Sequence, residues 1–368
     1  MKKKFVTLFP NLENIHLVKD VGLIPLTMCH DFEYDSKIVC FENDEYTYLK
    51  SEAKGLNLNF LPKCRFKYVS ELKYIIHNAK SIDILNMYHL SIHHSLLIFY
   101  IYKILNHNGV SFLKLDLDFR GVEDIENYSF LKKLVIKRLL KKVDIVSAES
   151  TIICEKIERV LDRDVMYLPN GYFKNKNQNH CLKRLNQFIT VGRLGTEQKA
   201  TDFLIKSFIR IHNQCDWNLV LVGKFERKLE KYISELLKEY PQLKNRIKLT
   251  GEIKDKDKLM NLYKESKVFV LPSKWESFGL VAIESMFCGD YLIVSDKVPP
   301  AGDFVKNDEY GKVIEFNNVV DLSDALLNAT KININYEKIK EYAEEHFDWK
   351  IICARLNDKI NSSWNTSK

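Results

Sequence analysis

The chain alternates short apolar segments with longer amphipathic ones. In the first half, strand-like segments lie at residues 4–9, 36–41, 82–87, 110–115 and 144–147. Helix-like segments lie at residues 18–28, 71–79, 93–106 and 129–142. Strands that alternate with helices at these spacings form parallel sheets covered on both faces. The pattern therefore predicts an α/β fold.

A polar stretch at residues 174–186, rich in Asn and Lys, interrupts this alternation. After it, strand-like segments recur at residues 188–191, 217–222, 247–250, 268–271 and 291–295. Helix-like segments recur at residues 201–212, 229–240, 256–265 and 280–288. A chain of 368 residues is long enough for two domains. We therefore predict two α/β domains, at residues 1–173 and 187–345, joined by the polar stretch as a linker.

Composition excludes several other classes of protein. Hydrophobic residues make up 46% and charged residues 29%, which is ordinary globular usage. The longest purely apolar run covers residues 96–102, too short to cross about 30 Å of hydrocarbon. The eight cysteines form no C-x-x-C pair, so we predict reduced thiols and a cytoplasmic protein. The net charge of +7 is spread over both halves, which argues against a nucleic-acid-binding domain.

Three strand-like segments of the second half end in a glycine, namely Gly192, Gly223 and Gly251. A glycine after a strand lets the backbone come close to a phosphate. Ligands of open parallel sheets bind at the carboxyl ends of the strands. A single glycine could simply turn the chain, but the three together predict a nucleotide site.

Residues 271–289 carry the most informative pattern, because two glutamates stand eight residues apart. Glu276 falls in a loop, and Glu284 falls on the second turn of a helix that starts near Leu280. The N–H groups at the start of this helix could hold a phosphate or sugar oxygens. Glu284 could accept two ribose hydroxyls, and Glu276 could accept hydroxyls of a sugar.

This segment resembles the E-x7-E motif of the retaining family-four glycosyltransferases, which have the GT-B fold. Val191-Gly-Arg-Leu194, followed by Lys199, is similar to that family's phosphate-binding pair. Leu168-Pro-Asn-Gly171 and Phe347-Asp-Trp349 resemble its interdomain and C-terminal motifs. The resemblance covers residues 165–350 well and the first 160 residues weakly. It implies two Rossmann-like domains that face each other across a cleft, and a C-terminal helix at 346–368 that returns to the first domain.

The resemblance also implies a role for each matching residue. Arg193 and Lys199 would neutralise the diphosphate that leaves, and Glu276 would hold the transferred sugar; these three are the predicted catalytic residues. Glu284 would bind the donor ribose. The other predicted donor-binding residues are Phe278, Gly279 and Leu280, through their backbone amides, Ile253 near the base, and Gly22 as the one nearby candidate for a first-domain phosphate loop.

The first domain departs from the family. Where the family often has a histidine at the end of a strand, this chain reads Lys114-Leu-Asp-Leu-Asp118, so Asp116 or Asp118 is expected on the acceptor side. Asn86 and His89 are further acceptor-side candidates, for which a capping or core role fits equally well. The D-x-D pattern holds a divalent metal in the other large glycosyltransferase fold. Because the nucleotide motifs lie in the other half, we predict no metal and no cofactor besides the donor substrate.

Residues 131–142 combine apolar side chains with six cations. Such a helix either lies on an anionic membrane or covers the sheet with a solvated basic face. The first reading would place the protein peripherally on the inner face of the cell membrane.

The sequence as a whole predicts a retaining glycosyltransferase. It would move a hexose or N-acetylhexosamine from a nucleotide sugar, a UDP-sugar first and a GDP-sugar second. The acceptor would be a glycan, a lipid-linked glycan or a glycoprotein, in surface polysaccharide or glycoconjugate synthesis. The alternatives are a non-catalytic GT-B partner subunit and a nucleotide-sugar epimerase.

Overall fold

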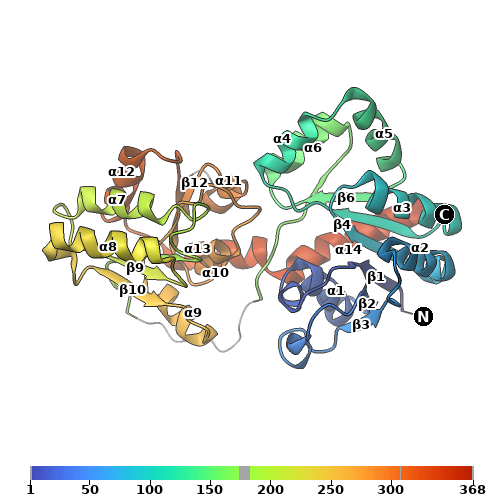
Figure 1. The fold of residues 1–368 in the computed structure, drawn as a ribbon, viewed down its shortest axis with the longest axis horizontal. Coiled ribbons are helices and arrows are strands. Elements are labelled where there is room, and N and C mark those ends of the chain that lie inside the picture. Colours follow the sequence, from blue (N-terminus) through green and yellow to red (C-terminus); the bar gives the residue numbers. More distant parts are fainter. Residues whose placement is uncertain (1, 174–182, 307, 367–368) are drawn as a thin grey trace. The chain divides into compact units, whose positions relative to one another are not determined.

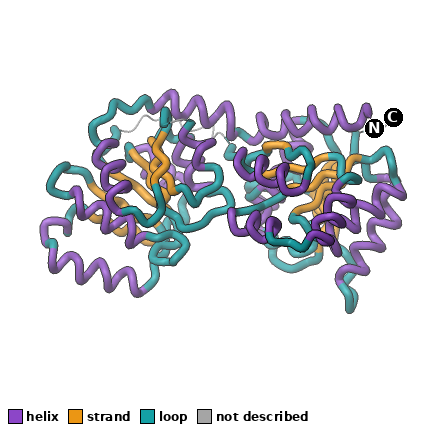
Figure 2. Tube along the Cα trace, turned by 90° about the horizontal axis from the view of Figure 1, so that it is seen from above, coloured by secondary structure: helices purple, strands orange, loops and turns teal. Residues whose placement is uncertain are grey.

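The protein consists of two compact units, described here from a computed structural model that covers residues 2–173, 183–306 and 308–366. The first unit comprises residues 1–173 and 348–368, and the second comprises residues 174–347. Each unit has strands enclosed by helices (Figure 2). Most of the predicted linker, residues 174–182, lies outside the described residues.

The first unit is built on a parallel sheet of seven strands in the order β3-β2-β1-β4-β5-β6-β7. Its strands are β1 (Lys4–Leu8), β2 (Asp35–Cys40), β3 (Asn57–Phe60), β4 (Ile84–Tyr88), β5 (Val110–Lys114), β6 (Ile145–Ala148) and β7 (Met166–Tyr167). Its helices are α1 (Asp20–Asp31), α2 (Lys67–Asn78), α3 (Leu97–Leu105), α4 (Phe119–Glu126), α5 (Phe130–Leu140), α6 (Thr151–Leu161) and α14 (Trp349–Thr366) (Figure 1).

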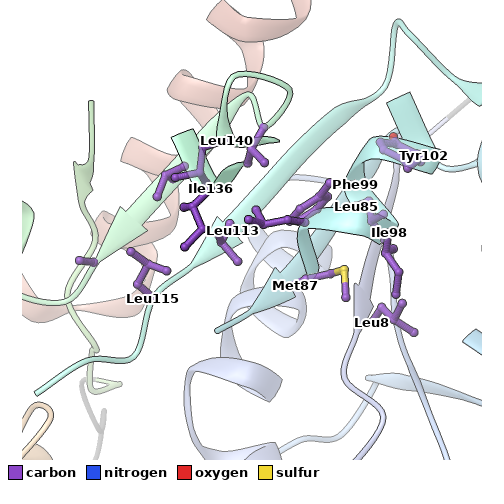
Figure 3. Close-up of a cluster of buried hydrophobic side chains, with 14 of the residues drawn as sticks. Leu8, Leu85, Met87, Ile98, Phe99, Tyr102, Leu113, Leu115, Ile136 and Leu140 are labelled. Atoms are coloured by element: carbon purple, nitrogen blue, oxygen red, sulfur yellow. The ribbon is translucent and has the colours of Figure 1, made fainter. Parts of the chain in front are cut away.

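Two separate cores cover the two faces of this sheet, because successive strand residues point to opposite sides. Val6 and Leu8 of β1 belong to the core under α2 to α6, whereas Phe5 belongs to the core under α1 and α14. Figure 3 shows part of the first core, where Ile136 of α5 and Phe99 of α3 lie over the sheet. Burial on both faces explains why these strands read as continuous apolar runs.

The C-terminal helix α14 returns to the first unit, as the resemblance implied. It packs along α1, and its first residue, Trp349, is completely buried. Tyr34 Oη donates a hydrogen bond of 2.8 Å to Asn357 of α14, and Lys3 Nζ donates one of 2.9 Å to Asn361. The second unit ends at Phe347, two residues before Trp349. The motif Phe347-Asp-Trp349 therefore places the buried Phe347 ring in the second unit and the buried Trp349 ring in the first.

The second unit is built on a parallel sheet of six strands in the order β10-β9-β8-β11-β12-β13. Its strands are β8 (Gln187–Val191), β9 (Asn218–Val222), β10 (Ile247–Gly251), β11 (Val268–Leu271), β12 (Tyr291–Ser295) and β13 (Gly311–Ile314). Its helices are α7 (Thr201–Ile211), α8 (Arg227–Glu239), α9 (Lys256–Glu265), α10 (Leu280–Met286), α11 (Ala301–Val305), α12 (Val319–Ala329) and α13 (Tyr336–Phe347). The α/β class with two parallel sheets is therefore confirmed.

Sequence periodicity located most elements up to residue 295 to within a few residues but missed β3, β7, α4 and α6, and no prediction was made for α11, β13, α12 and α13 beyond that point. The edge strand β3 reads Asn-Leu-Asn-Phe and is largely exposed, and β7 has only two residues. Helices α4 and α6 also went unpredicted, although a serine or aspartate caps each of them. No helix in the described part of the chain is both long and apolar enough to cross a membrane.

Candidate functional site

The three strand-end glycines of the second unit lie side by side, because β8, β9 and β10 are neighbours in the sheet. Gly192 N donates to Val222 O at 3.0 Å, and Gly223 N donates to Gly251 O at 2.9 Å. A Cβ atom on Gly223 would stand 1.9 Å from the carbonyl oxygen of Gly192. The backbones after β8 and β9 are thus in direct contact, which only glycine permits at position 223.

Lys199 and Glu276 form an ion pair at the same edge of the sheet. Lys199 comes just before α7, and Glu276 lies in the loop between β11 and α10. Ser273 Oγ donates to Glu276 Oε1 at 2.9 Å, which is also the oxygen that contacts Lys199 Nζ. Among the described residues, the other carboxylate oxygen, Oε2, accepts a hydrogen bond only from the Gln198 amide, at 3.5 Å. Glu276 is therefore held by one oxygen and offers the other.

Arg193 lies in the loop after β8 and is exposed. Thr196 Oγ1 donates to the Arg193 carbonyl at 2.8 Å, which fixes the backbone of this loop. Among the described residues, the Arg193 guanidinium forms no ion pair with a carboxylate. It is thus a solvated cation at the strand edge that carries Lys199.

Glu284 stands on α10 and is only partly exposed. Tyr263 Oη, which is fully buried on α9, donates to Glu284 Oε2 at 3.3 Å. Burial raises the pKa of Glu284 to about 7, although the Tyr263 hydrogen bond and Lys256 act in the opposite direction. Without a ligand, the carboxyl group of Glu284 is therefore present in both its charged and its neutral form near neutral pH.

The remaining predicted donor-side residues shape the backbone around this edge. The Phe278 ring is buried against Phe304 and Phe347, at centroid distances of 5.3 and 6.4 Å, so only its backbone could meet a ligand. Gly279 has φ of +94° and precedes the first residue of α10, Leu280. Ile253 is partly exposed, two residues beyond the end of β10.

Gly22 lies in the first turn of a helix and not in a loop. It lies inside α1, where a Cβ atom would stand 2.2 Å from the carbonyl oxygen of Leu17. The close packing of α1 against the preceding turn explains this glycine, and its own N–H donates to Lys19 O at 3.1 Å.

The acceptor-side candidates of the first unit fall into two groups. Asn86 is completely buried within the sheet, and its amide oxygen accepts from Thr7 Oγ1 at 3.1 Å. Asp118 caps α4 through Gly121 N at 2.9 Å and pairs with Arg120 at 2.6 Å. Structural roles therefore account for Asn86 and Asp118. His89 and Asp116 are both exposed at the carboxyl edge of the sheet, after β4 and β5.

The His89 backbone has φ of +63°, in the left-handed region that residues other than glycine rarely adopt. Its N–H donates to Lys114 O at 3.1 Å, and its carbonyl accepts from Ser95 Oγ at 2.7 Å. Such an enforced conformation at a strand end is typical of functional sites. Among the described residues, no group of three or more His, Cys, Asp or Glu side chains could hold a metal ion.

A buried polar cluster at the same edge was not predicted. Lys114, the last residue of β5, is completely buried, and its Nζ contacts Glu149 at 2.8 Å, Asn170 at 3.2 Å and Asp20 at 3.4 Å. Burial raises the pKa of Glu149, and the attraction of Lys114 only partly offsets this shift. Through Asp20 and Asn170, the cluster connects the start of α1 and the Pro-Asn-Gly segment with the end of β5. Its signal in the sequence is a lysine at the end of a strand whose residues are all buried.

Comparison with known proteins agrees with this geometry. Residues 173–346 match the family model described as Glycosyl transferases group 1. The matched residues are essentially those of the second unit, less than half of the chain.

Two curated relatives and one solved structure indicate how far the similarity extends. An uncharacterized glycosyltransferase of Methanocaldococcus jannaschii is 33% identical over 105 residues, 28% of this chain and 26% of that protein. The UDP-Gal:alpha-D-GlcNAc-diphosphoundecaprenol alpha-1,3-galactosyltransferase of Escherichia coli is 28% identical over 239 residues, 57% of this chain and 59% of that protein. The chain thus spans less than two thirds of the length of either relative.

The solved structure of Anabaena HepE in complex with UDP resembles almost the whole chain. The TM-score is 0.72 at 16% identity, and the match covers 98% of this chain and 100% of that chain. At this identity the likeness concerns the fold, which is the GT-B fold expected from the sequence.

Proposed function

We propose that the chain is a retaining glycosyltransferase that transfers a hexose or N-acetylhexosamine from a UDP-sugar. The observation that carries the proposal is the Lys199–Glu276 pair at the glycine-lined edge of the second sheet, with Arg193 in the loop after β8 and Glu284 on α10. This edge is where open parallel sheets bind nucleotides. The UDP bound to HepE and the UDP-galactose named for the E. coli relative support uridine as the base.

In this proposal the cations bind the phosphates and the carboxylates bind the sugar hydroxyls. The leaving diphosphate gains negative charge as the glycosidic bond breaks, and the Arg193 and Lys199 cations would stabilise it. Glu276 Oε2, whose hydrogen bond from the Gln198 amide is long at 3.5 Å, would accept a hydroxyl of the transferred sugar. Glu284, held by Tyr263, would accept the ribose hydroxyls in its ionised form.

The arrangement favours retention without a carboxylate nucleophile. A retaining glycosidase needs two close carboxyl groups, one of which attacks the anomeric carbon. Here the ammonium of Lys199 and the hydroxyl of Ser273 occupy Glu276 Oε1, which makes it a weak nucleophile. The acceptor would instead attack from the side of the leaving phosphate, whose oxygen takes the acceptor proton.

The acceptor would be a glycan, a lipid-linked glycan or a glycoprotein, in surface polysaccharide or glycoconjugate synthesis. The E. coli relative is named for a diphosphoundecaprenol-linked acceptor, which supports the lipid-linked class. In the first unit, Asp116 and His89 are the exposed candidates to contact it.

A donor panel tests the proposal. The purified chain is incubated with UDP-glucose, UDP-galactose, UDP-N-acetylglucosamine and GDP-mannose, and the products are followed by proton NMR. We expect slow hydrolysis of one UDP-sugar, with release of UDP and first appearance of the sugar as the anomer present in the donor. The opposite anomer would contradict retention. A changed sugar still bound to the nucleotide would indicate an epimerase, and no turnover of any donor would favour a non-catalytic partner.

A further inference from the structure

Exposed apolar side chains gather on one side of the first unit. On α5, the side chains of Phe130 and Leu131 are 79% and 72% exposed, and those of Leu134 and Val135 are about half exposed. Only Ile136 and Leu140 of this helix are buried in the core beneath it (Figure 3). Helix α5 is therefore apolar on its outer side as well as on its inner side. Isolated exposed leucines are ordinary, but a contiguous group of this kind marks an interaction surface.

The neighbouring helix α3 extends this surface. Leu97, Tyr100 and Ile104 are exposed and are spaced three and four residues apart, which places them on one side of the helix. Helices α3 and α5 cover the same face of the sheet, and α5 contacts the helical turn that leads into α3 (Figure 1). Their outward sides consequently belong to the same side of the unit, with α2 beyond α3.

All charged side chains on and directly after α5 are cations. Six cations lie between residues 132 and 142, and no acidic residue occurs from residue 127 to residue 143. None of these cations forms an ion pair with a carboxylate in the described part of the chain. Lys132 Nζ lies over the Tyr128 ring, and Lys133 Nζ donates to a backbone oxygen. The positive charge of the helix is therefore not neutralised within the protein.

We propose that the outer side of α5, extended by α3, binds the surface of an anionic lipid bilayer. Apolar side chains would enter the boundary between headgroups and acyl chains, while the lysines remain among the anionic headgroups. A protein partner fits less well, because interface cores are depleted of lysine and here lysines alternate with the apolar residues. The inference deepens the proposed function, since a bilayer would present a lipid-linked acceptor to the first unit.

Vesicle flotation of the full-length chain tests this inference. The probes are phosphatidylcholine vesicles with and without phosphatidylglycerol, at low and at physiological salt. We expect wild-type protein to float with the phosphatidylglycerol vesicles, and less so at higher salt, but not with phosphatidylcholine alone. The double variant Leu131→Glu/Leu134→Glu should lower the partition coefficient at least about tenfold, because two inserted side chains become charged.

The matched control is Val320→Glu/Ile332→Glu, which makes the same chemical change at two exposed positions of the second unit. It should float like wild type. Circular dichroism and the melting temperature check that both variants are folded, and UDP binding reports on the second unit separately.

The inference is overturned if wild-type protein stays below the phosphatidylglycerol vesicles, or if Leu131→Glu/Leu134→Glu floats equally well. Lipid-free self-association of wild type, lost in that variant, would assign the surface to a second copy instead. None of these results depends on donor turnover, so a failure here is distinct from a failure of the proposed function.

Discussion

Replacing Gly223 by alanine should destabilise the second unit by roughly 3–5 kcal/mol. The new Cβ atom would stand 1.9 Å from the Gly192 carbonyl oxygen, and the residue has φ of +130°, so a steric clash adds to backbone strain. The neighbouring atom belongs to the backbone and cannot rotate away. Relief of the clash requires the loops after β8 and β9 to separate, which would also distort the predicted phosphate site. Urea unfolding followed by circular dichroism measures the change in free energy.

Alanine substitutions at two other glycines distinguish the effect of the steric clash from that of backbone strain in the same measurement. Gly251 has φ of +74° with no atom near an added Cβ, so Gly251→Ala should cost only about 1 kcal/mol. Gly302 lies in a helix with open space around it, so Gly302→Ala should be neutral or stabilising by about 0.5–1 kcal/mol. A loss for Gly223→Ala no larger than that for Gly251→Ala would show that the loops do not press together as described.

Removing either phosphate-side cation should reduce donor turnover by about 10²–10³-fold. Arg193→Ala removes an exposed charge that forms no ion pair with the residues that the structure describes, so the melting temperature of the variant should stay that of wild type. Lys199→Met also leaves Glu276 without its ion-pair partner and should lower stability as well as turnover. Because the charge on the phosphate grows in the transition state, kcat should fall more than KM rises.

Lys206→Ala is the control for these two variants. Lys206 is an exposed lysine on α7 that pairs with Asp202, one turn away, and lies outside the proposed site. Its donor turnover should equal that of wild type. If Arg193→Ala retains turnover within about threefold, less than 1 kcal/mol of the barrier, the assignment of the leaving-group site is wrong.

The second unit could be predicted from the sequence as far as β12, because the signals of that part are local. Glycines after strands, a fixed spacing between two glutamates and a positive-φ glycine before α10 are all dictated by backbone geometry. The periodicity also located the buried strands, since both faces of a parallel sheet demand apolar side chains. The sequence did not reveal that Lys199 would contact Glu276, because that pairing depends on how β8 and β11 adjoin.

The first unit was harder to read because its polar edge is assembled from distant segments. The cluster around Lys114 joins residues from α1, the end of β6 and the segment after β7, which are up to 150 positions apart. No local pattern announces such a cluster. The sequence also did not reveal that Gly22 is closely packed against Leu17 or that Asp118 caps α4, because both contacts depend on the local fold; their roles at the site stay predictions.

The most direct test of the account is calorimetric titration of UDP at pH 7, in two buffers of different ionisation enthalpy. Ribose hydroxyls donate to an ionised carboxylate, so binding should drive Glu284 from its partly protonated state and release about half a proton. Affinity should therefore rise from pH 6 to pH 8. The terminal phosphate of UDP releases a smaller fraction of a proton of its own. Glu284→Gln should bind more weakly and release about half a proton less than wild type, whereas the exposed control Glu235→Gln should behave like wild type. Failure of UDP to bind, or binding that is indifferent to Glu284, would contradict a nucleotide site at this edge of the second sheet.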